Sequence, residues 1–132
     1  MTEGDLRKEL REDWDGWIDW REPVGNIGVG APDCEILYGN SLIPIELKVI
    51  KSWRVHIQPS QIRWHIIFSS YGGLALFLIG QSTPSGNVYY LGKGKDVKRI
   101  SKARYTDSLP FLTRSTPGCS SLSRFIRGYI DQ

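Results

Sequence analysis

The 132-residue sequence has few cysteines and no long apolar segment. Cys34 and Cys119 lie far apart without CxxC spacing, which excludes a disulfide framework and a zinc ribbon and is typical of a reducing cytosol. The longest uninterrupted apolar run, 74–79, is far shorter than the ~20 residues that a membrane span needs. Because Met1 to Asp5 is polar and acidic, we expect no secretory leader and a cytoplasmic location, in the host cytoplasm if the chain is phage-encoded.

Hydrophobic residues make up 40% of the sequence and charged residues 23%, which predicts one soluble globular domain over residues 1–132. The net charge of +3 is unevenly distributed. Residues 1–50 contain five Lys/Arg and eleven Asp/Glu, residues 51–92 contain three bases and no acid, and residues 93–132 contain nine bases and three acids. A basic second half predicts a polyanionic partner, nucleic acid first. The alternative is a solvated basic face.

Periodicity and turn residues predict an α/β layered domain of helix, strands, helix, strands and a helical tail. The expected helices are Thr2 to about Trp14, 59–71 with Ile62, Ile66 and Ile67 facing inward, a short basic helix over 96–105, and 122–130. The expected strands are Ile18 to Val24, 34–38, 42–50, 74–79 and 88–91, with a Gly-rich loop over 25–32, a hairpin turn at Gly39-Asn40 and a loop or mobile arm over 106–121.

The informative segment is the expected strand Ile43 to Ile50. Side chains alternate between the faces of a strand, so Glu46 and Lys48 share a face opposite four apolar residues. A carboxylate and an ammonium on one face of a central strand are costly unless something there needs them. The alternative is a cross-strand ion pair on an exposed face.

Asp33 directly precedes the neighbouring strand. Because antiparallel strands lie ~4.8 Å apart, Asp33 and Glu46 could converge on one hard cation, Mg²⁺ with Mn²⁺ as a substitute, and the carbonyl of Leu47 could add a third oxygen. Lys48 would point at the same place. This set is what metal-assisted hydrolysis of a phosphodiester requires.

Pro32-Asp33, followed after twelve residues by Glu46-Leu47-Lys48, resembles the signature of the PD-(D/E)XK nuclease superfamily. The wider context resembles its VRR-NUC and phage Holliday-junction-resolvase-like branch over roughly residues 1–92, namely Gly28 to Asp33, Ile45 to Lys48, Pro59 to Trp64 and Gly72-Gly73. The resemblance implies a restriction-endonuclease-like αβββαβ core, here with a C-terminal basic helical extension over 93–132.

By this resemblance, Asp33 and Glu46 would bind the metal and Lys48 would be the catalytic lysine. Gln61 would correspond to the family's second-helix glutamine, which supports the site near the lysine or a phosphate; the alternative is an exposed amide in the first helical turn. The family also carries a glutamate on its first helix. Glu3 lies within the apolar stripe of that helix and is our choice, while Glu9 borders the stripe.

Several other residues are candidates for contacts. Lys51, Arg54 and Arg63, and in the tail Lys98, Arg99 and Lys102, are candidate phosphate contacts or solvated surface. Trp14, Trp17 and Trp20 could stack on bases, but packing against the core or a second subunit is the favoured interpretation. The histidines, His56 and His65, lack metal-ligand spacing, and we expect each to be satisfied or exposed.

The leading hypothesis is a Mg²⁺-dependent endonuclease that hydrolyses DNA phosphodiester bonds, with branched, nicked or single-stranded DNA as candidate substrates. The alternatives are a non-catalytic nucleic-acid-binding module with the same fold and an RNA-processing nuclease. A chain of this size offers one active site, so cutting two strands would take a homodimer or two successive nicks. The apolar last helix and the tryptophans are candidate dimer surfaces.

Overall fold

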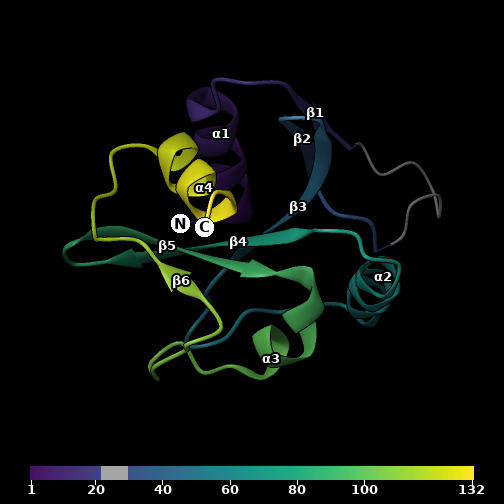
Figure 1. The fold of residues 1–132 in the computed structure, drawn as a ribbon. Coiled ribbons are helices and arrows are strands. Elements are labelled where there is room, and N and C mark those ends of the chain that lie inside the picture. Colours follow the sequence, from purple (N-terminus) through teal and green to yellow (C-terminus); the bar gives the residue numbers. More distant parts are fainter. Residues whose placement is uncertain (22–29) are drawn as a thin grey trace.

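A computed structural model describes residues 1–21 and 30–132 of the chain, and within them it shows a mixed six-stranded sheet flanked by helices (Figure 1). The helices are α1 (Glu3–Asp13), α2 (Pro59–Ser70), η1 (Gly94–Asp96), α3 (Val97–Lys102) and α4 (Leu122–Ile130). The strands are β1 (Ile18–Trp20), β2 (Cys34–Tyr38), β3 (Ser41–Val49), β4 (Leu76–Thr83), β5 (Gly86–Lys93) and β6 (Thr113–Arg114). The predicted α/β class and the predicted αβββαβ order are confirmed by this succession.

The strands follow the chain order β1 to β6 across the sheet, and among the strands of the described residues only β3 and β4 pair in parallel. Because parallel neighbours need a crossover, α2 connects them over one face of the sheet. The hairpin between β2 and β3 turns at Gly39, whose φ of +62° is the left-handed conformation that glycine adopts without a steric penalty. This hairpin places the beginning of β2 beside the middle of β3.

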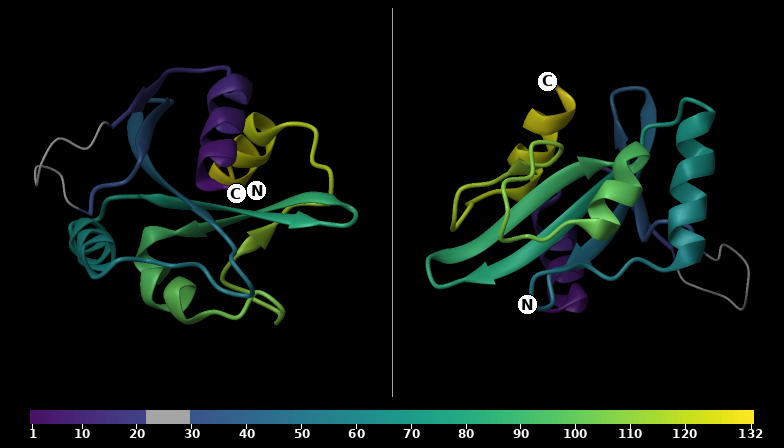
Figure 2. Two further views of the ribbon diagram at one scale, coloured as in Figure 1. Left: turned by 180° about the vertical axis from the view of Figure 1, so that it is seen from behind. Right: turned by 90° about the horizontal axis from the view of Figure 1, so that it is seen from below.

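Each face of the sheet has its own apolar core. On one face α1 and α4 pack side by side over the sheet, while α2 and α3 lie on the other face (Figures 1 and 2). Leu6 and Leu10 of α1 and Leu122 and Ile126 of α4 are buried in the first core. Val97 and Ile100 of α3 are buried in the second.

Residues 97–130 therefore contribute buried side chains to both cores. The apolar stripe of α4, one of the surfaces suggested for a dimer, is largely used within the chain: Leu122 and Ile126 are buried against α1 and the sheet, and Phe125, Tyr129 and Ile130 are partly buried. The segment 106–121, predicted as a loop or mobile arm, contains β6, which pairs with β5.

Two further predictions change at this level. The strand predicted from Ile18 to Val24 ends at Trp20 in the structure. Residues 22–24 of that prediction, and most of the Gly-rich loop predicted over 25–32, lie outside the described residues. The inward face of α2 was predicted wrongly for two residues, because Ile66 and Ile67 are 40% and 50% exposed. The side chains that α2 directs to the sheet include Ile62 and the fully buried His65.

Candidate active site

The polar face of β3 is buried. Glu46 is 1% exposed and Lys48 is 5% exposed, and they lie on the sheet face that α2 covers. The prediction that they share a face opposite Ile45, Leu47 and Val49 is confirmed, because those three side chains belong to the core on the α1 side. The alternative of an ion pair on an exposed face is excluded by this burial.

Asp33 lies next to Glu46. Its Oδ2 accepts a hydrogen bond from the backbone N–H of Leu47 at 2.8 Å, at the point where the pairing of β2 with β3 ends. The N–H and the carbonyl of one residue in a strand point to the same edge, so the Leu47 carbonyl is directed to the same side as Asp33. The structure thus brings together the three groups predicted as metal ligands.

The charge of Glu46 is only partly compensated. Burial, together with the adjacent Asp33 carboxyl, raises the pKa of Glu46, and the Lys48 ammonium opposes that rise. The Oε1 atom of Glu46 is buried and has no hydrogen-bond partner among the described residues. A buried, unpaired carboxylate oxygen beside a second carboxylate is a donor set that fits a hard divalent cation.

Lys48 is held by α2. Its Nζ donates to Oε1 of Gln61 at 2.9 Å, and the same oxygen accepts the backbone N–H of Gln58 at 2.9 Å. Gln61 thereby satisfies one of the free N–H groups at the beginning of α2 and orients Lys48 at the same time. Gln61 is half-buried and contacts Lys48, and its support of an active site stays a prediction.

The close approach of three chain segments explains why these side chains meet. Gly30 has a φ of +86°, and a Cβ at this position would overlap with the Ser60 carbonyl oxygen in the first turn of α2. Any side chain here would push that turn away from the segment leading to Asp33. A glycine at position 30 therefore allows Asp33, β3 and the N-terminus of α2 to converge.

His65 is a member of this site that sequence reasoning assigned to the satisfied or exposed class. It is fully buried, neither ring nitrogen has a hydrogen-bond partner among the described residues, and its Nε2 lies 3.8 Å from Oε1 of Glu46. Burial, with a smaller effect of the nearby Lys48, lowers the pKa of His65 to about 4, so the ring is neutral at pH 7. The ring packs on Phe77 of β4, with 4.4 Å between the ring centroids. The signal that could have found it is its spacing of four residues from Gln61 on one helix face.

The first-helix glutamates are placed differently. Glu3 is exposed in the first turn of α1, and its charge contributes a small rise to the pKa of Glu46. Glu9 accepts a hydrogen bond from the Tyr89 hydroxyl on β5 and so has a structural partner. In the described part of the chain no group of three or more acidic, histidine or cysteine side chains is close enough to hold a metal ion, so Glu3 does not join the Asp33–Glu46 pair.

The predicted phosphate contacts lie on two surfaces. Lys51 and Arg54 are exposed just after β3, and Arg63 is exposed on α2. Lys98, Arg99 and Lys102 are exposed on α3, on the same side of the sheet as the candidate site, and Arg99 lies 3.9 Å from Asp96. Of the three tryptophans considered for base stacking, Trp14 is buried and Trp17 is exposed. Trp20 pairs with Cys34, next to Asp33, and its ring is covered by Arg7 and Arg11.

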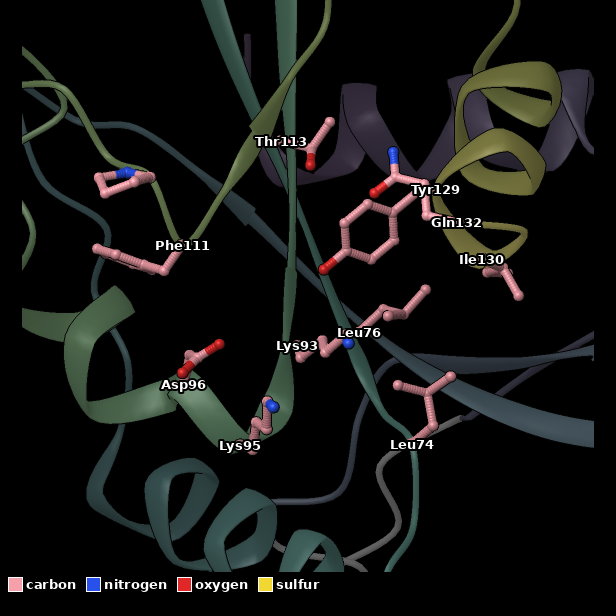
Figure 3. A pocket seen from close by; sticks show the side chains of 11 residues that line it. Leu74, Leu76, Lys93, Lys95, Asp96, Phe111, Thr113, Tyr129, Ile130 and Gln132 are labelled. Carbon is pink, nitrogen blue, oxygen red and sulfur yellow. The ribbon is translucent and has the colours of Figure 1, made fainter.

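A cavity of about 340 Å³ lies elsewhere, between the end of β5 and the end of α4 (Figure 3). Lys93, Lys95, Asp96 and Tyr129 line it, and the close-up shows them around a common space. It contains none of the residues of the candidate site. Its acid and its bases come from η1 and β5, not from β3.

Fold and site together define an α/β protein in which two adjacent acids and a helix-tethered lysine meet on the central strands. No family model matches the chain, and no curated protein matches it. A solved structure with a similar fold is Hjc, a Holliday junction resolvase from the archaeal hyperthermophile Archaeoglobus fulgidus. It is 13% identical, the match covers 86% of this chain and 84% of that chain, and the TM-score is 0.46. No helix in the described residues has the length and apolar character to cross a membrane.

Proposed function

We propose that this protein is a metal-dependent nuclease that hydrolyses phosphodiester bonds in DNA. The observation that supports it best is the buried Glu46 carboxyl, with one unpartnered oxygen, beside Asp33 and within the influence of Lys48. Keeping such a carboxylate in the interior costs free energy unless a cation binds there.

Asp33, Glu46 and the Leu47 carbonyl would hold Mg²⁺ or Mn²⁺. When bound, the cation polarises a phosphate oxygen and lowers the pKa of a bound water. The protein's own contribution is positional. The ammonium group of Lys48 donates one N–H to Gln61, which leaves two N–H groups to donate to a phosphate oxygen or to an attacking water. Its positive charge would stabilise the negative charge that develops on the phosphate.

The basic side chains extend the proposal from the site to the substrate. Lys51, Arg54 and Arg63 are close to the site along the chain, and Lys98, Arg99 and Lys102 lie on α3. Contacts of this kind hold the phosphate backbone without reading its sequence. We therefore propose branched, nicked or single-stranded DNA as substrate, with the cytoplasm as the place of action.

A cleavage panel in Mg²⁺ or Mn²⁺ tests this function, with single strands, duplex, nicked duplex, flaps, four-way junctions and RNA as substrates. We expect metal-dependent cleavage of at least one DNA form, and its loss in Lys48→Ala. Cleavage by Lys48→Ala at the wild-type rate would refute the assignment of the active site to these residues. Binding without cleavage of any substrate would favour a non-catalytic module, and cleavage of RNA alone would favour an RNA-processing nuclease.

A further inference from the structure

A tight turn just after β3 carries an exposed tryptophan, Trp53. Lys51 and Arg54 form an isolated antiparallel bridge, in which the N–H of Lys51 donates to the Arg54 carbonyl at 2.8 Å and the N–H of Arg54 donates back at 3.2 Å. Ser52 and Trp53 form the tip between them. Ser52 has a φ of +62°, which is uncommon for a residue other than glycine, and Trp53 is 46% exposed.

This turn is fixed to the body of the protein. The backbone N–H of Tyr105 donates to the Trp53 carbonyl at 2.9 Å. Val49 before the turn and Val55 and Ile57 after it are buried. The indole is therefore presented on an anchored backbone, and little conformational entropy would be lost when it binds a partner.

The surroundings of the indole are basic. Lys51 and Arg54 flank it, and the guanidinium carbon of Arg104 lies 5.6 Å from the ring centroid. None of these three cations has a carboxylate within ion-pair distance in the part of the chain that the structure describes. The sequence contains no acid between Glu46 and Asp96, and Asp107 follows Arg104 in the next turn. An aromatic face among cations is suited to a polyanion that also offers flat rings.

We propose that the Trp53 turn stacks on a DNA base whose face is left uncovered at a strand end, a nick or a branch, while Lys51, Arg54 and Arg104 contact the adjoining phosphates. This inference rests on the proposed nuclease function and names the feature of DNA that the protein selects. Trp53 is five residues from Lys48, so the two lie within ~18 Å of each other. In a continuous duplex every internal base is covered on both faces, so the indole has no base to stack on there.

Binding without metal tests the inference separately from cleavage. The protein carries Asp33→Asn and the buffer contains EDTA, so no substrate is cut. The probes are a single strand, a forked duplex and a closed duplex, which is a covalently closed circle without unpaired bases, each with 2-aminopurine at a defined position. Trp17→Ala is the matched control, since Trp17 is 49% exposed but lies between α1 and β1.

We expect Trp53→Ala to weaken binding to the single strand and to the fork about tenfold and to abolish quenching of the unpaired 2-aminopurine. Binding to the closed duplex should change less than twofold, Trp53→Phe should recover most of the affinity, and Trp17→Ala should bind all three probes normally. An equal loss on all three probes, or no loss on any, would overturn the inference. Failure of the nuclease proposal would appear instead as an intact Trp53 effect in a protein that cuts no substrate with metal.

Discussion

Lys48 and Gln61 are joined by a hydrogen bond of 2.9 Å between Nζ and Oε1, which connects the central strand β3 to the first turn of α2. The bond closes a loop of twelve residues, 49–60, with the Trp53 turn within it. The amide oxygen of Gln61 also accepts the N–H of Gln58 at 2.9 Å. One atom therefore caps the N-terminus of α2 and orients the lysine. We therefore propose that Gln61 positions Lys48.

Gln61→Ala should lower kcat about tenfold with little change in KM, because Lys48 loses its orientation but keeps its charge. Loss of the helix-end hydrogen bond should also cost about 1 kcal/mol of folding free energy. Steady-state kinetics and thermal unfolding measure the two effects separately. Ser60→Ala, one residue earlier in the same turn, is the control and should retain kcat; an unchanged kcat in Gln61→Ala would contradict the positioning role.

Asp33→Asn and Glu46→Gln should each reduce metal-dependent cleavage at least about 100-fold, because each removes a carboxyl group from the place proposed to hold the cation beside the reacting phosphate. Titration calorimetry with Mn²⁺ should show weakened metal binding in both. Glu46→Gln should not lower the melting temperature in EDTA, because burial raises the pKa of Glu46 and disfavours its ionised form, and the neutral amide carries no charge that has to be buried. Asp19→Asn, at an exposed position of β1, serves as the control. Cleavage at the wild-type rate by either site variant would refute the assignment.

The two first-helix glutamates should separate activity from stability. Glu3→Gln should reduce cleavage more than Glu9→Gln, because Glu9 is engaged by the Tyr89 hydroxyl, whereas Glu3 has an exposed side chain whose charge raises the pKa of Glu46 slightly. Glu9→Ala should lower stability by about 1–2 kcal/mol, since it leaves the Tyr89 hydroxyl without its carboxylate partner. Cleavage assays and urea unfolding of the same preparations make the comparison. A greater loss of activity in Glu9→Gln would show that the choice of Glu3 is wrong.

Neutralising Lys98, Arg99 and Lys102 together should weaken binding to every nucleic acid tested and flatten its dependence on salt by roughly 0.7–0.9 in log–log slope for each phosphate that the variant no longer binds. The rate at saturating substrate should hardly change, because these side chains lie on α3 and not on β3. Lys8→Gln with Arg124→Gln is the control on the opposite helical layer. An unchanged slope in the triple variant would identify α3 as a solvated face and leave Lys51, Arg54 and Arg63 as the contact surface.

Acid should weaken the contact between α4 and the end of α1. The Arg127 guanidinium, and then the Ser123 hydroxyl, hold the pKa of Asp15 below its ordinary value. Because the folded-state pKa is the lower one, the ionised carboxylate stabilises the fold above the ordinary pKa of about 4, and this contribution is lost as the pH falls through the folded-state value. Asp15→Asn should therefore lower the melting temperature by a few degrees at pH 7, and the difference from wild type should disappear at low pH. Asp19→Asn should show no such pH-dependent difference.

The sequence alone predicts the β3 side of the site well, because strand alternation is strict. Once Ile45 and Leu47 face a core, Glu46 and Lys48 must face the other way. The hairpin at Gly39 then determines which residue of the preceding segment lies opposite. The placement of Asp33, Glu46 and Lys48 follows from local rules with a short range.

The α2 side could not be predicted equally well, because the helix has apolar residues on most of its faces. Ile62, Ile66 and Ile67 suggest an inward stripe, yet β3 presents polar groups to this helix. The helix consequently turns Gln61 and His65 to the sheet and leaves Ile66 and Ile67 outside. Which side chains of α2 face the sheet can be predicted only when it is known which face of β3 the helix covers. That face is determined by contacts between residues far apart in the sequence.

The packing of α4 against α1 has a consequence for the synthesis of the chain. Asp13 accepts the backbone N–H of Ser123 at 2.8 Å and the hydroxyl of Ser121, across more than a hundred residues. During translation, the apolar stripe of α1 is made before the sheet and α4 that cover it, and the part of the cover that α4 provides becomes available only when residues 122–130 emerge. At a translation rate of ~5–20 residues per second, α4 is made many seconds after α1. During this time the apolar stripe of α1 is exposed to chaperones and to other nascent chains.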